Sequence, residues 1–204
     1  MRYSSLMIPI LILAAGSSSR MRGRDKLMEI VDGTPLLTRQ INMALAVSND
    51  VRVALPPRPH PRYELVDPTA ARPIEVADAA EGMGASLRTL FRTLPDGTRN
   101  AMVLLADLPE LQATDLQAVI DGVAVAPRAL IWRGSTDNCE GGHPMIVDRA
   151  LFPEFCDLTG DSGGNRIIAK HADDVHLVRL GPRARLDLDT PEDWAAWRGA
   201  TSDD

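Results

Sequence analysis

The feature that most constrains this chain is an apolar run near its start that breaks into a loop of small residues and ends in a cluster of cations. Residues 10–13 read as a buried β-strand, no bulky side chain follows before Arg20, and Lys26 closes the cluster. Small residues let backbone N–H groups approach phosphate oxygens closely, and cations offset charge that backbone dipoles leave unneutralised. The stretch therefore predicts a phosphate-binding loop at the end of a strand.

Two common phosphate-binding motifs are excluded for this loop. No Gly-Lys-Ser/Thr follows at the spacing of a P-loop, and the glycines do not match the Gly-x-Gly-x-x-Gly dinucleotide fingerprint. We therefore expect a triphosphate to be held in a third way.

Strand, loop and helix patterns alternate along the rest of the chain. Strand patterns are read at residues 10–13, 51–55, 74–77, 101–106, 128–132, 143–147, 175–180 and 185–189. Helical patterns are read at 35–45, 87–94, 113–120, 149–155 and 166–171, and a capping box at Thr190 opens a last helix. This alternation predicts one α/β domain over residues 1–204, with three α/β/α layers around a mostly parallel sheet. The strand at 143–147 is a candidate to run against the others.

Composition narrows the classes of protein further. A formal net charge of -6 argues against a general nucleic-acid binder, because such proteins carry excess Lys and Arg. No apolar run approaches the roughly 20 residues that a membrane crossing needs. Cys139 and Cys156 lack metal-ligand spacing and are expected to be free thiols. A signal peptide cleaved after Ala15 would destroy the loop, so we expect a cytoplasmic protein.

Acidic side chains follow two of the strand patterns. Asp107 follows the most apolar strand pattern, and ligands bind at that end of strands in open α/β sheets, although a turn or cap aspartate is the alternative. Asp187 and Asp189 would share one face of a strand at 185–189, because strand side chains repeat every two residues. Carboxylates gathered near Lys26 and a triphosphate need a screening cation. Mg²⁺ fits because it accepts carboxylates, phosphate oxygens and water.

Several of these segments resemble one family. The segment Leu13-Ala-Ala-Gly-Ser-Ser-Ser-Arg20-Met, with Lys26 downstream, resembles the N-terminal signature of nucleotidyltransferases. It is most similar to the MobA-like group, which includes molybdenum cofactor guanylyl- and cytidylyltransferases. Asp107-Leu-Pro109 resembles their Asp-x-Pro segment, and residues 187–193 resemble the Asp-x-Asp-Thr-Pro-Glu-Asp motif of the cytidylyltransferases. The resemblance implies a Rossmann-like nucleotidyltransferase fold with a nucleotide-binding half, 1–110, and an acceptor half, 111–204.

The resemblance also implies a role for each matching residue. It implies catalytic roles for Lys26, Arg20 and Asp107, and Mg²⁺ binding by Asp107 and Asp187, with Asp189 left open as the second ligand. The implied nucleotide contacts are Leu13, Ala14, Ala15, Gly16, Ser17, Arg20, Lys26, Gly82, Gly84 and Ser86. The implied acceptor contacts are His143, Asp161 and Asp189. Structural roles stay open for two of these residues: Ser86 can be a helix N-cap, and a lone histidine such as His143 is more often a packed or surface residue than a ligand contact.

The implied reaction is in-line attack by an acceptor phosphate on the nucleotide α-phosphorus, with release of pyrophosphate. Positioning and electrostatics carry such a step, so no protein nucleophile is required. Ala15 and the Asp187 motif are similar to those of cytidylyltransferases, which favours CTP as the nucleotide and a molybdopterin-like acceptor. GTP with molybdopterin is the alternative, and a sugar or alcohol phosphate is another possible acceptor. A molybdoenzyme or its chaperone would then be the partner that collects the product.

Two other classes of function compete with this one. A non-catalytic nucleotide sensor that delivers cofactor would have little need of both candidate metal carboxylates. A small glycosyltransferase of similar architecture would need Asp-x-Asp after the central strand, where this chain has Asp107-Leu-Pro109.

Overall fold

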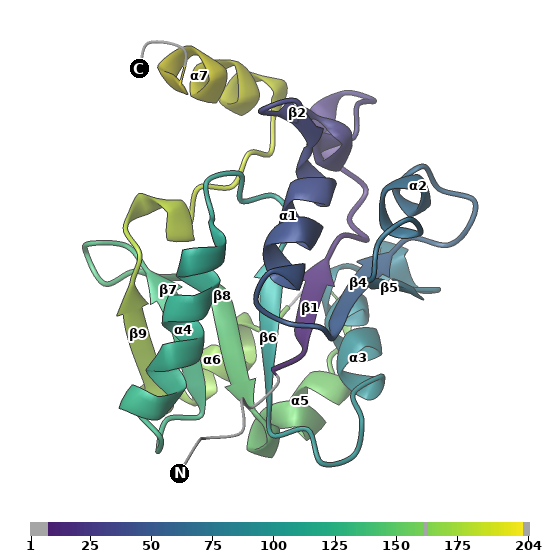
Figure 1. Ribbon diagram of the computed structural model, residues 1–204. Coiled ribbons are helices and arrows are strands. Elements are labelled where there is room, and N and C mark those ends of the chain that lie inside the picture. Colours follow the sequence, from purple (N-terminus) through teal and green to yellow (C-terminus); the bar gives the residue numbers. More distant parts are fainter. Residues whose placement is uncertain (1–7, 161–162, 202–204) are drawn as a thin grey trace.

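A seven-stranded sheet forms the centre of the molecule, in the order β5-β4-β1-β6-β8-β7-β9 (Figure 1). The computed structural model describes residues 8–160 and 163–201. The strands are β1 (Ile10–Leu13), β4 (Val51–Leu55), β5 (Arg72–Glu75), β6 (Asn100–Leu105), β7 (Ile131–Ser135), β8 (Gly141–Asp148) and β9 (Val175–Arg179). Only β8 runs against its neighbours β6 and β7, while the other strand pairs of this sheet are parallel. The mostly parallel sheet and the reversed strand at 143–147 are therefore confirmed.

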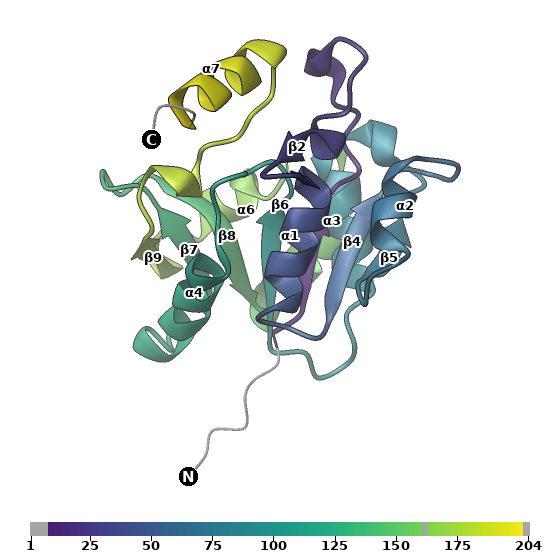
Figure 2. The ribbon, with the colours of Figure 1, turned by 45° about the horizontal axis from the view of Figure 1, so that its top comes forward.

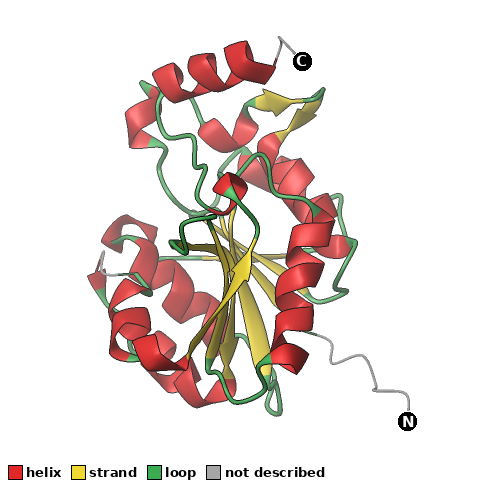
Figure 3. Cartoon of the chain, turned by 90° about the vertical axis from the view of Figure 1, so that its left-hand side faces the viewer, coloured by secondary structure: helices red, strands yellow, loops and turns green. Residues whose placement is uncertain are grey.

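Helices cover both faces of this sheet and complete the three predicted layers (Figure 3). They are α1 (Leu36–Leu45), α2 (Arg62–Val66), α3 (Met83–Arg92), α4 (Ala113–Val125), α5 (Phe152–Cys156), α6 (Asn165–Lys170) and α7 (Pro191–Thr201). The first buried core lies between the sheet and α1, α2 and α4, and the second lies between the sheet and α3, α5 and α6. The mostly parallel sheet and its two helical layers match the Rossmann-like fold that the resemblance implies.

Alternation along the central strands supplies both cores. Ile10 and Ile12 belong to the first core, whereas Leu11 between them belongs to the second, and all three are fully buried. A strand covered by helices on both faces buries every residue, so its sequence is a continuous apolar run. This is why the central strands were readable from the sequence.

The segment at 185–189 is not a strand, contrary to prediction. It follows a short 3-10 turn, Pro182–Ala184, and runs as irregular chain across the end of the sheet. Its Leu188 is buried, and the Leu188 backbone N–H donates to the Asp107 carbonyl at 3.3 Å. The apolar alternation therefore reflects one leucine anchored beside the β6 loop. The strand assignment behind the placing of Asp187 and Asp189 on one face is wrong, although their two carboxyl groups do meet in a hydrogen bond.

The start of α3 also differs from prediction. The helix begins at Met83 after Gly82, whose positive φ of 113° suits glycine, so Ser86 lies inside the helix and does not cap it. The short helix α2 was missed, because no helical pattern was read between residues 45 and 87.

The last helix, α7, lies at the end of the molecule, beside the small hairpin of β2 (Ile30–Val31) and β3 (Thr34–Pro35) (Figure 2). The predicted capping box is present: the Asp193 N–H donates to Thr190 Oγ1 at 3.1 Å, and the Thr190 N–H donates to Asp193 Oδ2 at 2.8 Å. Arg198 ties the helix to Glu29 at 2.8 Å. In the described ranges, no helix combines the length and apolarity required to cross a membrane.

Candidate active site

Three segments that are far apart in the sequence meet at one edge of the sheet. Strands β1 and β6 are parallel neighbours, with Leu13 paired to Leu105, so the loops that follow them leave from the same edge (Figure 1). The first loop carries Arg20 and Lys26, and the second begins at Asp107. The segment through Leu188 joins them by its hydrogen bond to the Asp107 carbonyl. This is the edge at which open α/β sheets bind their ligands.

The Lys26 ammonium bridges two carboxylates at the centre of this edge. Its Nζ donates to Asp107 Oδ2 at 2.5 Å and to Asp189 Oδ1 at 2.7 Å. Arg20 Nη2 contacts the other oxygen, Asp189 Oδ2, at 2.7 Å. The Lys26, Asp107 and Asp189 side chains are only 16–18% exposed, so these charges interact through a partly desolvated medium.

The pKa values of this cluster follow from burial and neighbouring charge. Burial disfavours the Lys26 ammonium, but the charges and hydrogen bonds of Asp107 and Asp189 outweigh it and raise the pKa of Lys26. Burial works against the Asp189 carboxylate too, yet Lys26 and Arg20 lower the pKa of Asp189. Burial, together with the negative charges of Asp189 and Asp107, raises the pKa of Asp187. A hydrogen bond shared with Asp189 acts in the same direction, so among the described residues Asp187 is the acid of this cluster whose charge no cation compensates.

The oxygens of the predicted metal ligands fit a hard divalent cation. Asp107 Oδ1 is buried and has no hydrogen-bond partner among the described residues. Asp187 feels the charges of both other acids and, in the part of the chain that the structure describes, makes no ion pair with Lys or Arg. The same ranges hold no ready-made group of three or more metal-ligating side chains. Mg²⁺ does not require one, because it binds through one or two carboxylates and takes its other ligands from phosphates and water.

A buried arginine that the sequence analysis missed contacts the loop between β1 and Lys26, which is the predicted phosphate-binding loop and is called the phosphate loop below. Arg62, at the start of α2, is 1% exposed. Its Nη1 donates to the carbonyls of Ala14 at 2.6 Å and Gly16 at 2.8 Å. Its Nε and Nη2 donate to the two oxygens of Asp25, each at 2.7 Å, and Nη2 also reaches Ser18 Oγ at 3.1 Å. One guanidinium thus fixes both ends of the loop that precedes Lys26.

A second missed residue supports the Asp107 turn. Gln40 of α1 is 1% exposed, and its Nε2 donates to the Leu108 carbonyl at 2.9 Å. It stands in the apolar stripe of α1, beside Leu36, Leu37 and Ile41. A polar residue within the apolar stripe of a predicted helix indicates a buried hydrogen bond, so the sequence pattern could have pointed to Gln40. Arg62 gave no such signal, because it follows a proline-dense segment that looks like an exposed loop.

The predicted nucleotide contacts divide into accessible and buried positions. Gly16 and Ser17 are exposed at the loop, whereas Ala14 and Ala15 are buried. Gly84 and Ser86 are also buried, and a Cβ on Gly84 would lie 2.5 Å from the Gly160 carbonyl oxygen. The absence of a side chain at Gly84 is therefore required for packing between α3 and the loop before α6.

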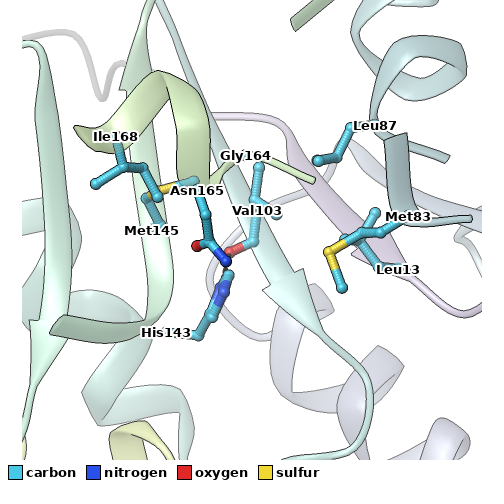
Figure 4. A pocket seen from close by; sticks show the side chains of 9 residues that line it. All are labelled: Leu13, Met83, Leu87, Val103, His143, Met145, Gly164, Asn165 and Ile168. Atoms are coloured by element: carbon cyan, nitrogen blue, oxygen red, sulfur yellow. Dashed lines mark hydrogen bonds between the residues drawn. The ribbon is translucent and has the colours of Figure 1, made fainter. Parts of the chain in front are cut away.

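The structure describes two of the three predicted acceptor residues. Asp189 contacts Lys26 and Arg20, and Asp161 lies outside the described residues. His143 borders a cavity of about 30 Å³, as Figure 4 shows. The cavity is lined by Leu13, Met83, Leu87, Val103, His143, Met145, Gly164, Asn165 and Ile168. Burial and then the nearby Arg133 lower the pKa of His143 to about 4, so its ring is neutral at pH 7.

Comparison with known proteins identifies relatives of this arrangement. The profile of the MobA-like NTP transferase domain matches residues 10–175. A probable molybdenum cofactor guanylyltransferase from Synechococcus elongatus is 35% identical over 197 residues, covering 91% of this chain and 95% of the relative. The 2-C-methyl-D-erythritol 4-phosphate cytidylyltransferase of Salinibacter ruber is 26% identical over 226 residues, covering 94% of each chain. The Rv0371C protein of Mycobacterium tuberculosis, solved in complex with manganese, shares the fold with a TM-score of 0.74 at 22% identity, over 93% of this chain and 97% of that one.

Proposed function

The chain belongs to the MobA-like NTP transferase family and is thus an enzyme of the nucleotidyltransferase class, and from this premise we propose the reaction that it catalyses. It transfers a nucleoside monophosphate from a nucleoside triphosphate to a phosphorylated acceptor and releases pyrophosphate. The observation that carries this proposal is the Lys26 ammonium between Asp107 and Asp189 at the end of the phosphate loop.

The residues of the loop bind and orient the triphosphate. The exposed backbone of Gly16 and Ser17 faces the phosphates, while Arg20 and Lys26 supply positive charge. Asp189 contacts both cations, so we assign it to orienting them rather than to the acceptor. On substrate binding, Lys26 exchanges part of its carboxylate contacts for phosphate oxygens and stabilises the charge that builds up on the α-phosphoryl group.

Asp107 and Asp187 are the residues that would hold a divalent metal, with Mg²⁺ as the proposed ion. The free Asp107 Oδ1 and the uncompensated Asp187 support this assignment. When bound, the ion would screen the repulsion between carboxylates and phosphates and draw charge from the phosphate oxygens.

CTP is the first candidate for the nucleotide, and GTP is the alternative. The motif at residues 187–193 resembles that of cytidylyltransferases, whereas the relative that is 35% identical is named as a guanylyltransferase. The second sequence argument for CTP, Ala15, has its side chain buried among apolar residues of the second core, so it would act on the base only through the shape of the loop.

Molybdopterin is the proposed acceptor, because the relative from Synechococcus is named for the molybdenum cofactor. A sugar or alcohol phosphate is the alternative, since the relative from Salinibacter is named for methylerythritol 4-phosphate. The product would then pass to a molybdoenzyme or its chaperone.

The test presents the enzyme with the four nucleoside triphosphates together, Mg²⁺ and either molybdopterin or methylerythritol 4-phosphate as acceptor, and determines the mass of any product by mass spectrometry. The proposal expects a molybdopterin adduct carrying CMP. A guanylyl adduct would replace CTP by GTP. Adducts with methylerythritol 4-phosphate but not with molybdopterin would change the acceptor, and no adduct or pyrophosphate with any pair would favour a nucleotide sensor.

A further inference from the structure

Among the arginines that the structure describes, one that is partly buried, Arg133, has no acid to pair with in the described ranges. The buried or nearly buried arginines Arg52, Arg62 and Arg88 each contact a carboxylate within 2.8 Å. Arg133 of β7 is also partly buried, but within residues 8–160 and 163–201 no carboxylate lies within ion-pair distance of it. The hydrogen bond that it makes within the described part of the chain runs from Nε to the Gly142 carbonyl at 3.1 Å. The rest of its guanidinium is available to an anion.

Two adjacent glycines bring a second arginine to the same place. A Cβ on Gly141 would lie 2.7 Å from Arg133 Nε, so in this conformation the Arg133 side chain packs directly against the glycine backbone. A Cβ on Gly142 would lie 2.8 Å from Arg185 Cγ and 2.1 Å from the Ala184 carbonyl oxygen. The start of β8 is therefore packed between Arg133 and the segment that carries Arg185.

The charges of these two arginines are poorly compensated. Arg185 contacts Glu140 at 3.3 Å, but both side chains are more than half exposed, so the pair is weak. Burial, and then the positive charge of Arg185, lower the pKa of Arg133. Two cations within electrostatic range of each other attract an anion more strongly than either does alone.

Their position connects them with the proposed reaction. The end of β7 and the start of β8 lie at the sheet edge that carries Asp107, because β7 runs parallel to β6 and β8 runs against both. His143, directly after Gly142, feels the positive charge of Arg133 and the negative charge of Asp107. Arg20 and Lys26 come from the other half of the chain and are assigned to the nucleoside triphosphate. Arg133 and Arg185 lie at the same sheet edge and have no assigned ligand.

We propose that Arg133 and Arg185 bind the phosphate monoester of the acceptor. The inference rests on the proposed nucleotidyl transfer, in which an oxygen of that phosphate forms a bond to the α-phosphorus. The bond between the α-phosphorus and its bridging oxygen breaks, and pyrophosphate leaves with the electron pair. The paired arginines hold the attacking phosphate in line and offset its charge as it approaches the triphosphate.

The test compares Arg133→Gln and Arg185→Gln with Arg179→Gln, a control on the neighbouring strand β9. Arg179 is 75% exposed and pairs only with Asp137 among the described residues. Pyrophosphate release is measured with acceptor and nucleotide varied separately, using the acceptor found active with the wild-type enzyme. We expect the Arg133 change to raise the KM for acceptor roughly 10- to 100-fold, as loss of a charge-assisted contact does, with the KM for nucleotide unchanged. Arg185→Gln should act in the same direction, and Arg179→Gln should not.

Binding of a phosphate monoester separates this inference from the reaction itself. Methyl phosphate is titrated by calorimetry into the wild-type protein saturated with a non-hydrolysable nucleotide, and then into each folded variant. Loss of methyl phosphate binding in Arg133→Gln and its partial recovery in Arg133→Lys support the inference even if no acceptor has been found. Equal binding in all variants, or a raised KM for nucleotide instead of acceptor, would overturn it.

Discussion

Arg62 and Asp25 form a bidentate ion pair at the phosphate loop, with both N–O distances at 2.7 Å. The same guanidinium holds the carbonyls of Ala14 and Gly16, so the pair links the end of β1 to the residue before Lys26. The loop that is to bind phosphate thus takes its shape from a helix start 37 residues further along the chain.

Replacing this arginine should affect both stability and nucleotide binding. Arg62→Ala leaves Asp25 and two carbonyls without their partner, and we expect it to lower the free energy of unfolding by roughly 3–5 kcal/mol. Arg62→Lys keeps the positive charge but loses the planar guanidinium fork, which donates to Asp25 and to two carbonyls at once. The variant should therefore unfold at a lower denaturant concentration than the wild type. Its KM for nucleotide should rise while its KM for acceptor stays unchanged. Denaturant titration and initial rates measure the two effects. A lysine variant with wild-type kinetics would show that the fork does not shape the loop.

The same ion pair predicts a pH dependence of stability. Burial works against the Asp25 carboxylate, but the hydrogen bonds and charge of Arg62 dominate and hold the pKa of Asp25 below its ordinary 3.8. A group whose pKa is lower in the folded state stabilises the fold above its unfolded pKa and loses that contribution as the pH falls through the folded value. We therefore expect the free energy of unfolding to drop as the pH is lowered below 3.8, and to drop less steeply in Asp25→Asn. Parallel curves for the two proteins would contradict this.

Two glycine substitutions should separate packing from ligand binding. In Gly84→Ala the new Cβ would meet the Gly160 carbonyl at 2.5 Å, so we expect a loss of about 1–3 kcal/mol in unfolding free energy. In Gly16→Ala nothing lies within 4 Å of the new Cβ, so the fold should keep its stability. Its methyl group would stand where the phosphates approach, and the KM for nucleotide should rise. Thermal unfolding and steady-state kinetics of both variants check the pair, and a stable Gly84→Ala would show that the loop gives way.

Gln40 should act on the reaction through the Asp107 turn. Gln40→Leu keeps the side chain's approximate size but removes the hydrogen bond to the Leu108 carbonyl. We expect kcat to fall several-fold, with the KM for nucleotide little changed, because the turn that presents Asp107 loses its support. Unchanged kcat in a folded variant would mean that Gln40 serves packing alone.

The order and type of the central elements could be predicted because the strands are buried on both faces. Strands β1 and β4 match their predicted ranges, and β6 begins one residue before its predicted range and ends one before its predicted end. Asp107 was placed correctly because it follows an apolar run at a defined edge of the sheet. The segment carrying Asp187 and Asp189 misled the strand reading, because a single buried leucine imitated a period of two. Arg62 could not have been found, since it follows a proline-dense segment and its partners, the Asp25 carboxylate and two loop carbonyls, lie at least 37 residues earlier in the chain.

The most direct test of the central claim is the amount of pyrophosphate and adduct formed by wild type and by Asp107→Asn in the presence of Mg²⁺. Asp107→Glu is the matched variant that keeps the charge. The account predicts one pyrophosphate for each adduct in the wild type, a loss of roughly 100-fold or more in kcat for Asp107→Asn, and nucleotide binding that persists. Adduct formation by Asp107→Asn at the wild-type rate would contradict it.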